Sequence, residues 1–131
     1  MSDLDRSEKI TINLGPIDLG QIDLLVSEGF FANRTDFIRT AIRRQLESRS
    51  GAVETTVARR ELVLGVEHYS RDALERVRES GQMVELRVLG LATIADDVSP
   101  ELARATIARV EVLGAFRATH AVKAALASRT T

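Results

Sequence analysis

Polar and aliphatic residues alternate near the start of the sequence. The polar residues are Lys9, Thr11 and Asn13, and the aliphatic residues between and after them are Ile10, Ile12 and Leu14. A period of two is typical of a β-strand with one buried face, because successive side chains point to opposite sides. The solvent face of such a strand would present an ammonium, a hydroxyl and a carboxamide group, all of which form hydrogen bonds.

A second polar cluster, Asn33-Arg34-Thr35-Asp36, precedes an amphipathic segment. The Asn33 side chain can cap a helix that begins here, and Asp36 can reciprocate three residues later. The amides of Arg34 and Thr35 would then lack partners within the helix, and the helix dipole adds positive potential beside them. This pattern predicts an anion site at the start of the helix.

Residues for covalent or metal chemistry are scarce. The chain has 131 residues, no cysteine and two histidines, which excludes thiol chemistry and a cysteine zinc cage. We expect His68 and His120 to be surface or capping residues and Asp96-Asp97 to form a solvated turn. The sequence also has no nucleophile elbow and no phosphate-binding glycine loop. We therefore expect no metal, no cofactor and no enzymatic activity.

Charge and aromatic content restrict the partners. A formal net charge of -1 argues against coating nucleic acid by bulk electrostatics, and 4% aromatic residues are too few for stacking on single strands. A nucleic-acid partner would therefore be double-stranded.

The acidic, polar start lacks the features of a signal peptide, and no apolar run approaches the ~18 residues of a membrane span. We expect a cytoplasmic, nucleoid-associated protein that does not contact membranes.

Residues 8–47 have the pattern of a strand followed by two helices. The strand covers residues 8–14, Gly15-Pro16 ends it, and helical spacing of apolar residues continues over residues 17–28. A second helix starts after Asn33 and carries an apolar stripe that includes Phe37, Ala41 and Leu46. A unit of this length cannot usually bury enough surface to fold as a monomer, so a partner chain is expected.

In this order of strand, helix, turn glycine, cap and helix, residues 8–47 resemble the ribbon-helix-helix transcriptional regulators of the MetJ/Arc/CopG type. The segments that carry the resemblance are Lys9-Ile10-Thr11-Ile12-Asn13-Leu14, Gly29 and Asn33-Arg34-Thr35-Asp36-Phe37-Ile38-Arg39. The resemblance implies an intertwined homodimer in which two copies of the strand pair antiparallel and enter the DNA major groove.

The resemblance assigns roles to the two polar clusters. Lys9, Thr11 and Asn13 would face the groove and read base edges, while Ile10, Ile12 and Leu14 would pack on the helices. Asn33, Arg34 and Thr35 would bind phosphate and so position the ribbon. Residues beyond 47 lie outside the resemblance.

The rest of the chain contains a repeat. The motifs Val63-Leu64-Gly65, Val88-Leu89-Gly90 and Val112-Leu113-Gly114 recur at spacings of 25 and 24 residues. Each is followed by a helix with a cap, at Ser70, Ser99 and Thr119, so the predicted unit is strand, turn at the glycine, and helix. Short connections favour parallel strands, as in a leucine-rich solenoid or a small open α/β layer. The first copy fits less well, because Leu62 stands where the others have Arg87 and Glu111, and it is either an end cap or not a true member.

The predicted fold class is α+β, an N-terminal ribbon-helix-helix followed by strand-turn-helix repeats with parallel strands. Residues 1–48 form the DNA-binding and dimerisation domain, residues 49–60 a linker or helix extension, and residues 61–131 a module for oligomerisation or partner binding.

The favoured function is a homodimeric repressor that binds double-stranded DNA, with the repeats driving assembly into a tetramer or larger. One alternative is the antitoxin of a toxin-antitoxin pair, in which the C-terminal half binds a protein partner. The other is a self-assembling structural DNA-binding protein, since open edge strands of a parallel solenoid pair readily.

Overall fold

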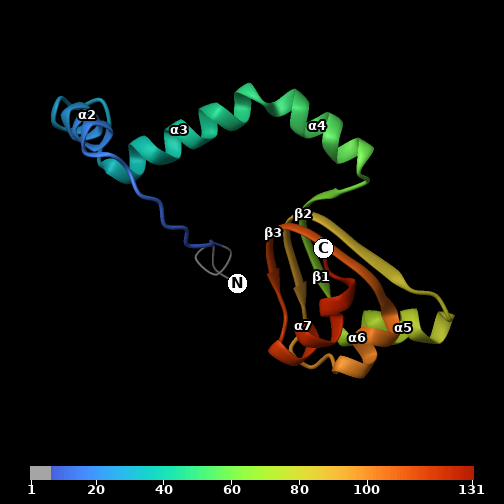
Figure 1. Ribbon diagram of the computed structural model, residues 1–131. Helices are drawn as coiled ribbons and strands as arrows, with labels where there is room; N and C mark the ends of the chain where they lie inside the picture. Colours follow the sequence, from blue (N-terminus) through green and yellow to red (C-terminus); the bar gives the residue numbers. More distant parts are fainter. Residues whose placement is uncertain (1–6) are drawn as a thin grey trace. The chain divides into compact units, whose positions relative to one another are not determined.

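The computed structural model describes residues 7–131, which form two compact units, residues 7–56 and residues 57–131 (Figure 1). The N-terminal unit contains helices α2 (Pro16–Ser27) and α3 (Arg34–Ser48), and helix α4 (Ser50–Arg59) crosses the boundary between the units. The C-terminal unit alternates strands and helices. Its elements are β1 (Val63–Tyr69), α5 (Arg71–Ser80), β2 (Val84–Ile94), α6 (Pro100–Thr106), β3 (Ile107–Arg117), α7 (His120–Leu126) and a 3₁₀ turn, η1 (Ala127–Arg129). The fold class is α+β with a three-stranded parallel sheet.

The N-terminal strand predicted over residues 8–14 does not form within a single chain. Residues 7–15 are neither helix nor strand, and the sheet among residues 7–131 consists of β1, β2 and β3. A strand is defined by hydrogen bonds to a neighbouring strand. The predicted neighbour is a second copy of the same segment, so one chain alone cannot supply it.

The predicted cap at the start of α3 is present. Asn33 has extended backbone angles, and its side-chain oxygen accepts a hydrogen bond of 2.7 Å from the amide of Asp36. Asp36 reciprocates one residue earlier than the sequence suggested, because its carboxylate accepts from the amide of Ala32 at 2.9 Å. These two bonds fix the direction from which the chain enters α3.

The three predicted repeats lie side by side in register. The strand order is β1-β2-β3, and Val63, Val88 and Val112 form one row of the sheet, followed by rows of leucine and glycine. The first copy is therefore a true repeat, and β1 forms the edge of the sheet. The predicted turn at each glycine is wrong, since every strand continues beyond its glycine. The glycines instead occupy a row within the sheet.

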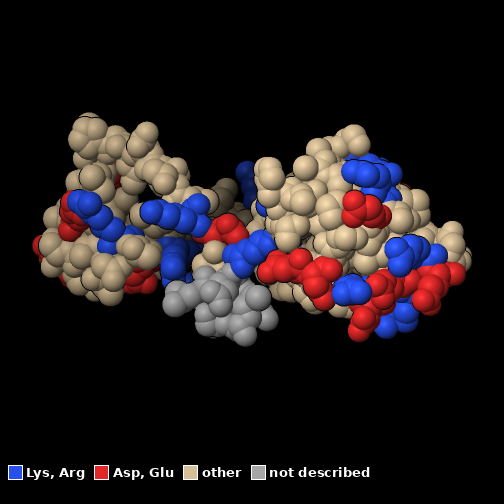
Figure 2. All heavy atoms as spheres, turned by 90° about the horizontal axis from the view of Figure 1, so that it is seen from below, with Lys and Arg blue, Asp and Glu red and all other residues tan. Residues whose placement is uncertain are grey.

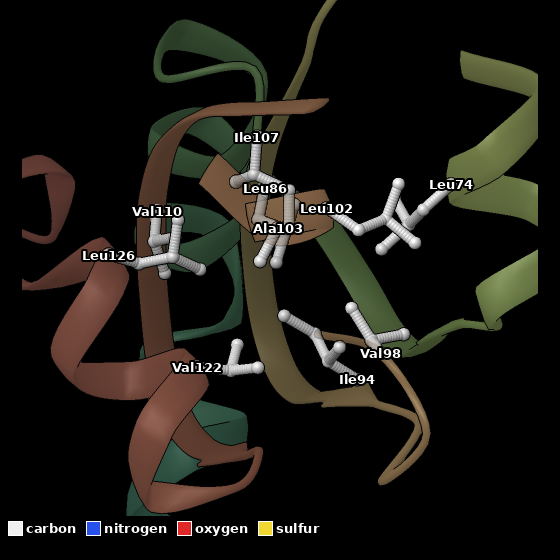
Figure 3. Packing of buried hydrophobic residues seen from close by; sticks show 10 residues of the cluster. All are labelled: Leu74, Leu86, Ile94, Val98, Leu102, Ala103, Ile107, Val110, Val122 and Leu126. Carbon is white, nitrogen blue, oxygen red and sulfur yellow. The ribbon is translucent and has the colours of Figure 1, made fainter. Parts of the chain in front are cut away.

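Helices α5, α6 and α7 pack against one face of the sheet and build the core of the C-terminal unit (Figure 3). Each helix begins at its predicted cap, where Ser70, Ser99 or Thr119 accepts a hydrogen bond from the amide three residues later. The core combines strand and helix residues, all of them buried. They are Leu74, Leu86, Ile94, Val98, Leu102, Ala103, Ile107, Val110, Val122 and Leu126.

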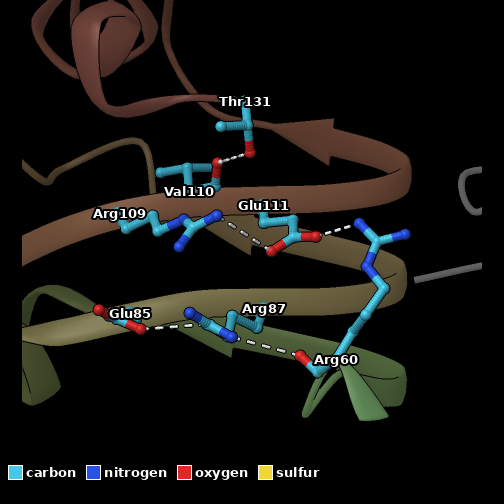
Figure 4. A network of polar contacts seen from close by, with 7 residues as sticks. All are labelled: Arg60, Glu85, Arg87, Arg109, Val110, Glu111 and Thr131. Atoms are coloured by element: carbon cyan, nitrogen blue, oxygen red, sulfur yellow. Dashed lines mark hydrogen bonds and ion pairs between the residues drawn. The ribbon is translucent and has the colours of Figure 1, made fainter. Parts of the chain in front are cut away.

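Charged side chains join the beginning of β1 to the other two strands (Figure 4). Arg60 donates a hydrogen bond to the carboxylate of Glu111 on β3, and Arg109 lies 3.7 Å from the second oxygen of that carboxylate. Arg87 on β2 donates to the carbonyl oxygen of Arg60 at 3.3 Å and pairs with Glu85 at 3.0 Å. The hydrogen bond from Arg60 lowers the pKa of Glu111 below the ordinary value, although burial of the carboxylate acts in the opposite direction.

Candidate nucleic-acid interface

The segment predicted to form the ribbon is exposed on both of its faces. Lys9, Thr11 and Asn13 are all open to solvent, as the prediction of base contacts requires. The intervening aliphatic residues are exposed as well, with Ile10 at 73%. Water therefore surrounds a row of aliphatic side chains that the alternating pattern assigns to a buried face.

Both helices of the N-terminal unit also leave apolar residues in solvent. Ile22 is the buried residue of α2, whereas α3 has no buried residue at all. The exposed apolar side chains of this unit are Ile10, Ile12, Leu14, Ile17, Leu24, Phe30, Ile42 and Leu46. Apolar side chains exposed in this number are typical of a surface that another molecule covers. The described part of the N-terminal unit thus has little core of its own.

A hollow of about 340 Å³ lies between α2, α3 and the preceding segment. Leu14 from the segment, Ile22 and Leu25 from α2, and Phe37 from α3 contribute apolar walls. Phe37 is held in place by an edge-to-face contact with Phe31, whose ring centroid lies 5.0 Å away. The hollow is large enough for aliphatic side chains of a second copy.

The N-terminus of α3 presents the predicted anion site to solvent. Asn33, Arg34 and Thr35 are all exposed. The side-chain oxygen of Asn33 is occupied by the Asp36 amide, so Asn33 holds the turn rather than reaching outward. The amides of Arg34 and Thr35 belong to the first helical turn, where no helical carbonyl can accept from them. Hydrogen-bond donors and the helix dipole therefore face water together.

Arg34 has an acidic partner that the sequence pattern did not reveal. Its Nε and Nη2 atoms donate to the two carboxylate oxygens of Asp23 on α2, each at 2.8 Å. The hydrogen bonds lower the pKa of Asp23 and raise the pKa of Arg34. The bidentate pair orients the guanidinium and neutralises much of its charge. No local spacing could have found it, because the two residues come from different helices.

Other basic residues lie along α3. Arg39, Arg43 and Arg44 are exposed on this helix, although the sequence offered no firm role for them. In the C-terminal unit, basic and acidic side chains are interspersed in the view of Figure 2, with large areas that carry neither charge. In the N-terminal unit, Lys9 and the exposed arginines of α3 supply basic groups that a polyanion could contact.

Within residues 7–131, no group of His, Asp and Glu side chains is arranged to hold a metal ion. His68 is exposed, as expected, and its Nδ1 atom lies 2.5 Å from the hydroxyl oxygen of Thr93. His120 is exposed at the start of α7. Every helix in this part of the chain is too short or too polar to span a lipid bilayer.

Comparison with known proteins identifies a family for the chain. A sequence model of the Ribbon-Helix-Helix transcriptional regulator family matches residues 5–123, which include nearly all of both units. Neither a curated protein nor a solved structure is matched by the chain. The match extends well beyond residues 8–47, where the alternating strand and capped helix are found.

Proposed function

The chain belongs to the ribbon-helix-helix transcriptional regulator family, and we propose that it is a repressor that reads DNA with a ribbon formed by two copies of residues 8–14. Proteins of this family bind DNA, usually as dimers, and are generally not enzymes. The observation that carries the proposal is the exposed aliphatic row of Ile10, Ile12 and Leu14, which one chain leaves without a core to join.

Antiparallel pairing of two copies accounts for both faces of this segment. The aliphatic side chains of the two strands would lie on one face and cover the apolar residues of α2 and α3, including those that line the hollow beside Leu14. Burying this surface supplies the driving force for association, at about 25 cal/mol per Å² of apolar area. The polar side chains of both strands would then share the opposite face.

The polar face suits the major groove. A two-stranded ribbon fits a groove about 12 Å wide. The Lys9 ammonium group can donate to the N7 and O6 acceptors of guanine, and the Asn13 carboxamide can form paired bonds with adenine N6 and N7. The Thr11 hydroxyl group can donate or accept and so contributes less selectivity.

The start of α3 would hold the backbone of the same duplex. The amides of Arg34 and Thr35 would donate to a phosphate, and Asn33 keeps the turn in shape through its bond to the Asp36 amide. Arg34 can share its guanidinium between Asp23 and a phosphate oxygen, since the Asp23 pair uses Nε and Nη2 and leaves Nη1. These contacts set the position of the ribbon without reading sequence.

Selection of bound duplexes from a random pool tests this assignment. Wild-type protein is expected to enrich a palindromic sequence with half-sites about one helical turn apart. The variant Asn13→Ala should lose preference at one position of each half-site, by about 1–3 kcal/mol. Gln82→Ala removes a carboxamide from an exposed turn of the C-terminal unit and serves as the control. Identical enriched sequences for all three proteins would rule out base reading by Asn13.

A further inference from the structure

Glycines form one row across the parallel sheet. Gly65, Gly90 and Gly114 are neighbours in the register and have φ values of +134°, +138° and +120°. A Cβ atom at Gly90 would lie 2.2 Å from the carbonyl oxygen of Gly65, and one at Gly114 would lie 2.1 Å from that of Gly90. Each strand thus places a carbonyl group in space that a side chain would need on the next strand.

Gly65 has the same backbone conformation at the outer edge of β1. Nothing lies within 4 Å of a Cβ atom built at this glycine, because β1 is the first strand of the sheet. At Gly90 and Gly114, the missing side chain leaves a recess that holds the carbonyl oxygen of the preceding strand. Gly65 leaves the same kind of recess at the outer edge of β1. Within the described chain, no strand fills it.

The opposite edge of the sheet is partly covered. Thr130 forms a parallel bridge with Val110 on β3, and the amide of Thr131 donates to the Val110 carbonyl oxygen at 3.0 Å. These contacts stop at the beginning of β3, and residues 112–116 have no strand beside them on this edge in the described chain. The register relates residues 112–116 through β2 to residues 63–67 of β1. The open part of β3 thus corresponds to the start of β1.

We propose that C-terminal units of two copies pair head to tail, with β1 of one copy parallel to β3 of another. The register would place Val63 beside Val112 of the second copy and Gly65 beside Gly114 of the second copy. The carbonyl oxygen of that Gly114 would then enter the recess at Gly65, as the carbonyl oxygens of Gly65 and Gly90 do within one chain. This proposal does not rest on DNA binding.

Side chains on the face away from the helices support a second copy as the occupant. Leu64 and Val66 are 68% and 53% exposed although they belong to rows of apolar residues that continue on β2 and β3. In the proposed pairing, they would lie beside Leu113 and Ala115 of the second copy, which extends both rows. Among residues 63–67 and 112–116, Glu67 is the only charged residue. Its neighbour in the pairing would be Phe116 of the second copy, so no like charges meet.

Head-to-tail pairing differs in its consequences from a two-fold contact. Each copy has one β1 edge and one β3 edge, so the assembly continues to grow unless a ring closes. Dimers joined through their N-terminal units would thereby be linked into larger assemblies.

Sedimentation velocity of the full-length protein over a range of concentrations tests the pairing. The weight-average mass of the wild type should rise with concentration beyond that of a dimer. Leu64→Lys and Leu113→Glu should each raise the concentration needed for this growth roughly tenfold or more, because each places a charge among leucines. The double variant should recover growth, since the new lysine and glutamate would be neighbours across the contact, whereas Leu64→Lys with Leu113→Lys should not.

The same series can overturn the proposal. A wild-type mass that stays at that of a dimer at every concentration would exclude the pairing, and so would an effect of Leu64→Lys without any effect of Leu113→Glu, which indicates that β1 pairs with another β1. Failure of the double variant to recover growth, with circular dichroism showing native folding, would exclude the proposed register. Binding of an operator duplex, measured in parallel, reports on the DNA-binding proposal independently.

Discussion

Gly114 packs so closely against Gly90 that a Cβ atom at Gly114 would lie 2.1 Å from the Gly90 carbonyl oxygen. Non-bonded contacts between a methyl group and backbone are never this short, and the φ of +120° at Gly114 is unfavourable for any other residue. The spacing of the valine-leucine-glycine motifs is thereby explained by a contact between strands.

Substitution of Gly114 should therefore destabilise the C-terminal unit. We expect Gly114→Ala to lower the free energy of unfolding by roughly 2–4 kcal/mol, from backbone strain and the contact with Gly90. Urea unfolding can be followed by fluorescence of Tyr69, the single tyrosine of a chain without tryptophan, so the signal reports on this unit. Gly51→Ala is the control, because its Cβ atom meets nothing and alanine favours the helix that contains it. Equal stability of both variants would contradict the account.

The two faces of the sheet should respond differently to loss of a leucine. Leu86 is fully buried beneath the helices, whereas Leu64 is 68% exposed on the other face of the sheet. Leu86→Ala should cost about 2–5 kcal/mol of unfolding free energy, while Leu64→Ala should cost less than about 1 kcal/mol at low protein concentration. The same urea experiment measures both. Similar losses would mean that the exposed face is covered in solution.

The Arg60–Glu111 contact makes the stability of the C-terminal unit sensitive to acid. Because the pKa of Glu111 is lower in the folded protein, its contribution is present above the ordinary carboxyl pKa and is lost as the pH falls through the folded pKa. Glu111→Gln should therefore lower stability at neutral pH and flatten its decline below about pH 4–5. Thermal unfolding over roughly pH 3 to 7 compares this variant with Glu54→Gln on the exposed surface of α4. Parallel curves for Glu111→Gln and the wild type would contradict the assignment.

Asp23 should limit how strongly Arg34 attracts DNA. Asp23→Asn removes the carboxylate that binds the guanidinium, so affinity for every duplex should rise about equally. Arg34→Ala should weaken all duplexes and reduce the salt dependence of binding by about one phosphate contact. Titrations of specific and unrelated duplexes at several salt concentrations measure both effects. A change in preferred sequence would instead mean that Arg34 contacts bases.

Local signals in the sequence located many elements of the fold. The caps at Asn33, Ser70, Ser99 and Thr119 lie where expected, since a cap depends on residues within one turn. The parallel register followed from the repeat spacing. The glycine was misinterpreted as a turn, because its role depends on the carbonyl group of an adjacent strand about 25 residues away.

Contacts between distant residues were not predictable in the same way. The pairs Arg34–Asp23 and Arg60–Glu111 join different elements, and no spacing distinguishes them from other arginine and acidic residues. For the predicted base-reading residues Lys9, Thr11 and Asn13, alternation indicates which face they share but not what that face contacts. That contact depends on a second chain and on DNA.

The central claim is that residues 8–14 of two chains pair antiparallel, and an inter-chain distance tests it directly. The chain has no cysteine, so Thr11→Cys provides a single site for a nitroxide label, and electron–electron double resonance measures the distance between the two labels. The account predicts one narrow distance below about 20 Å, given strands roughly 5 Å apart and two label arms. A broad distribution, or no dipolar signal between chains, would contradict it.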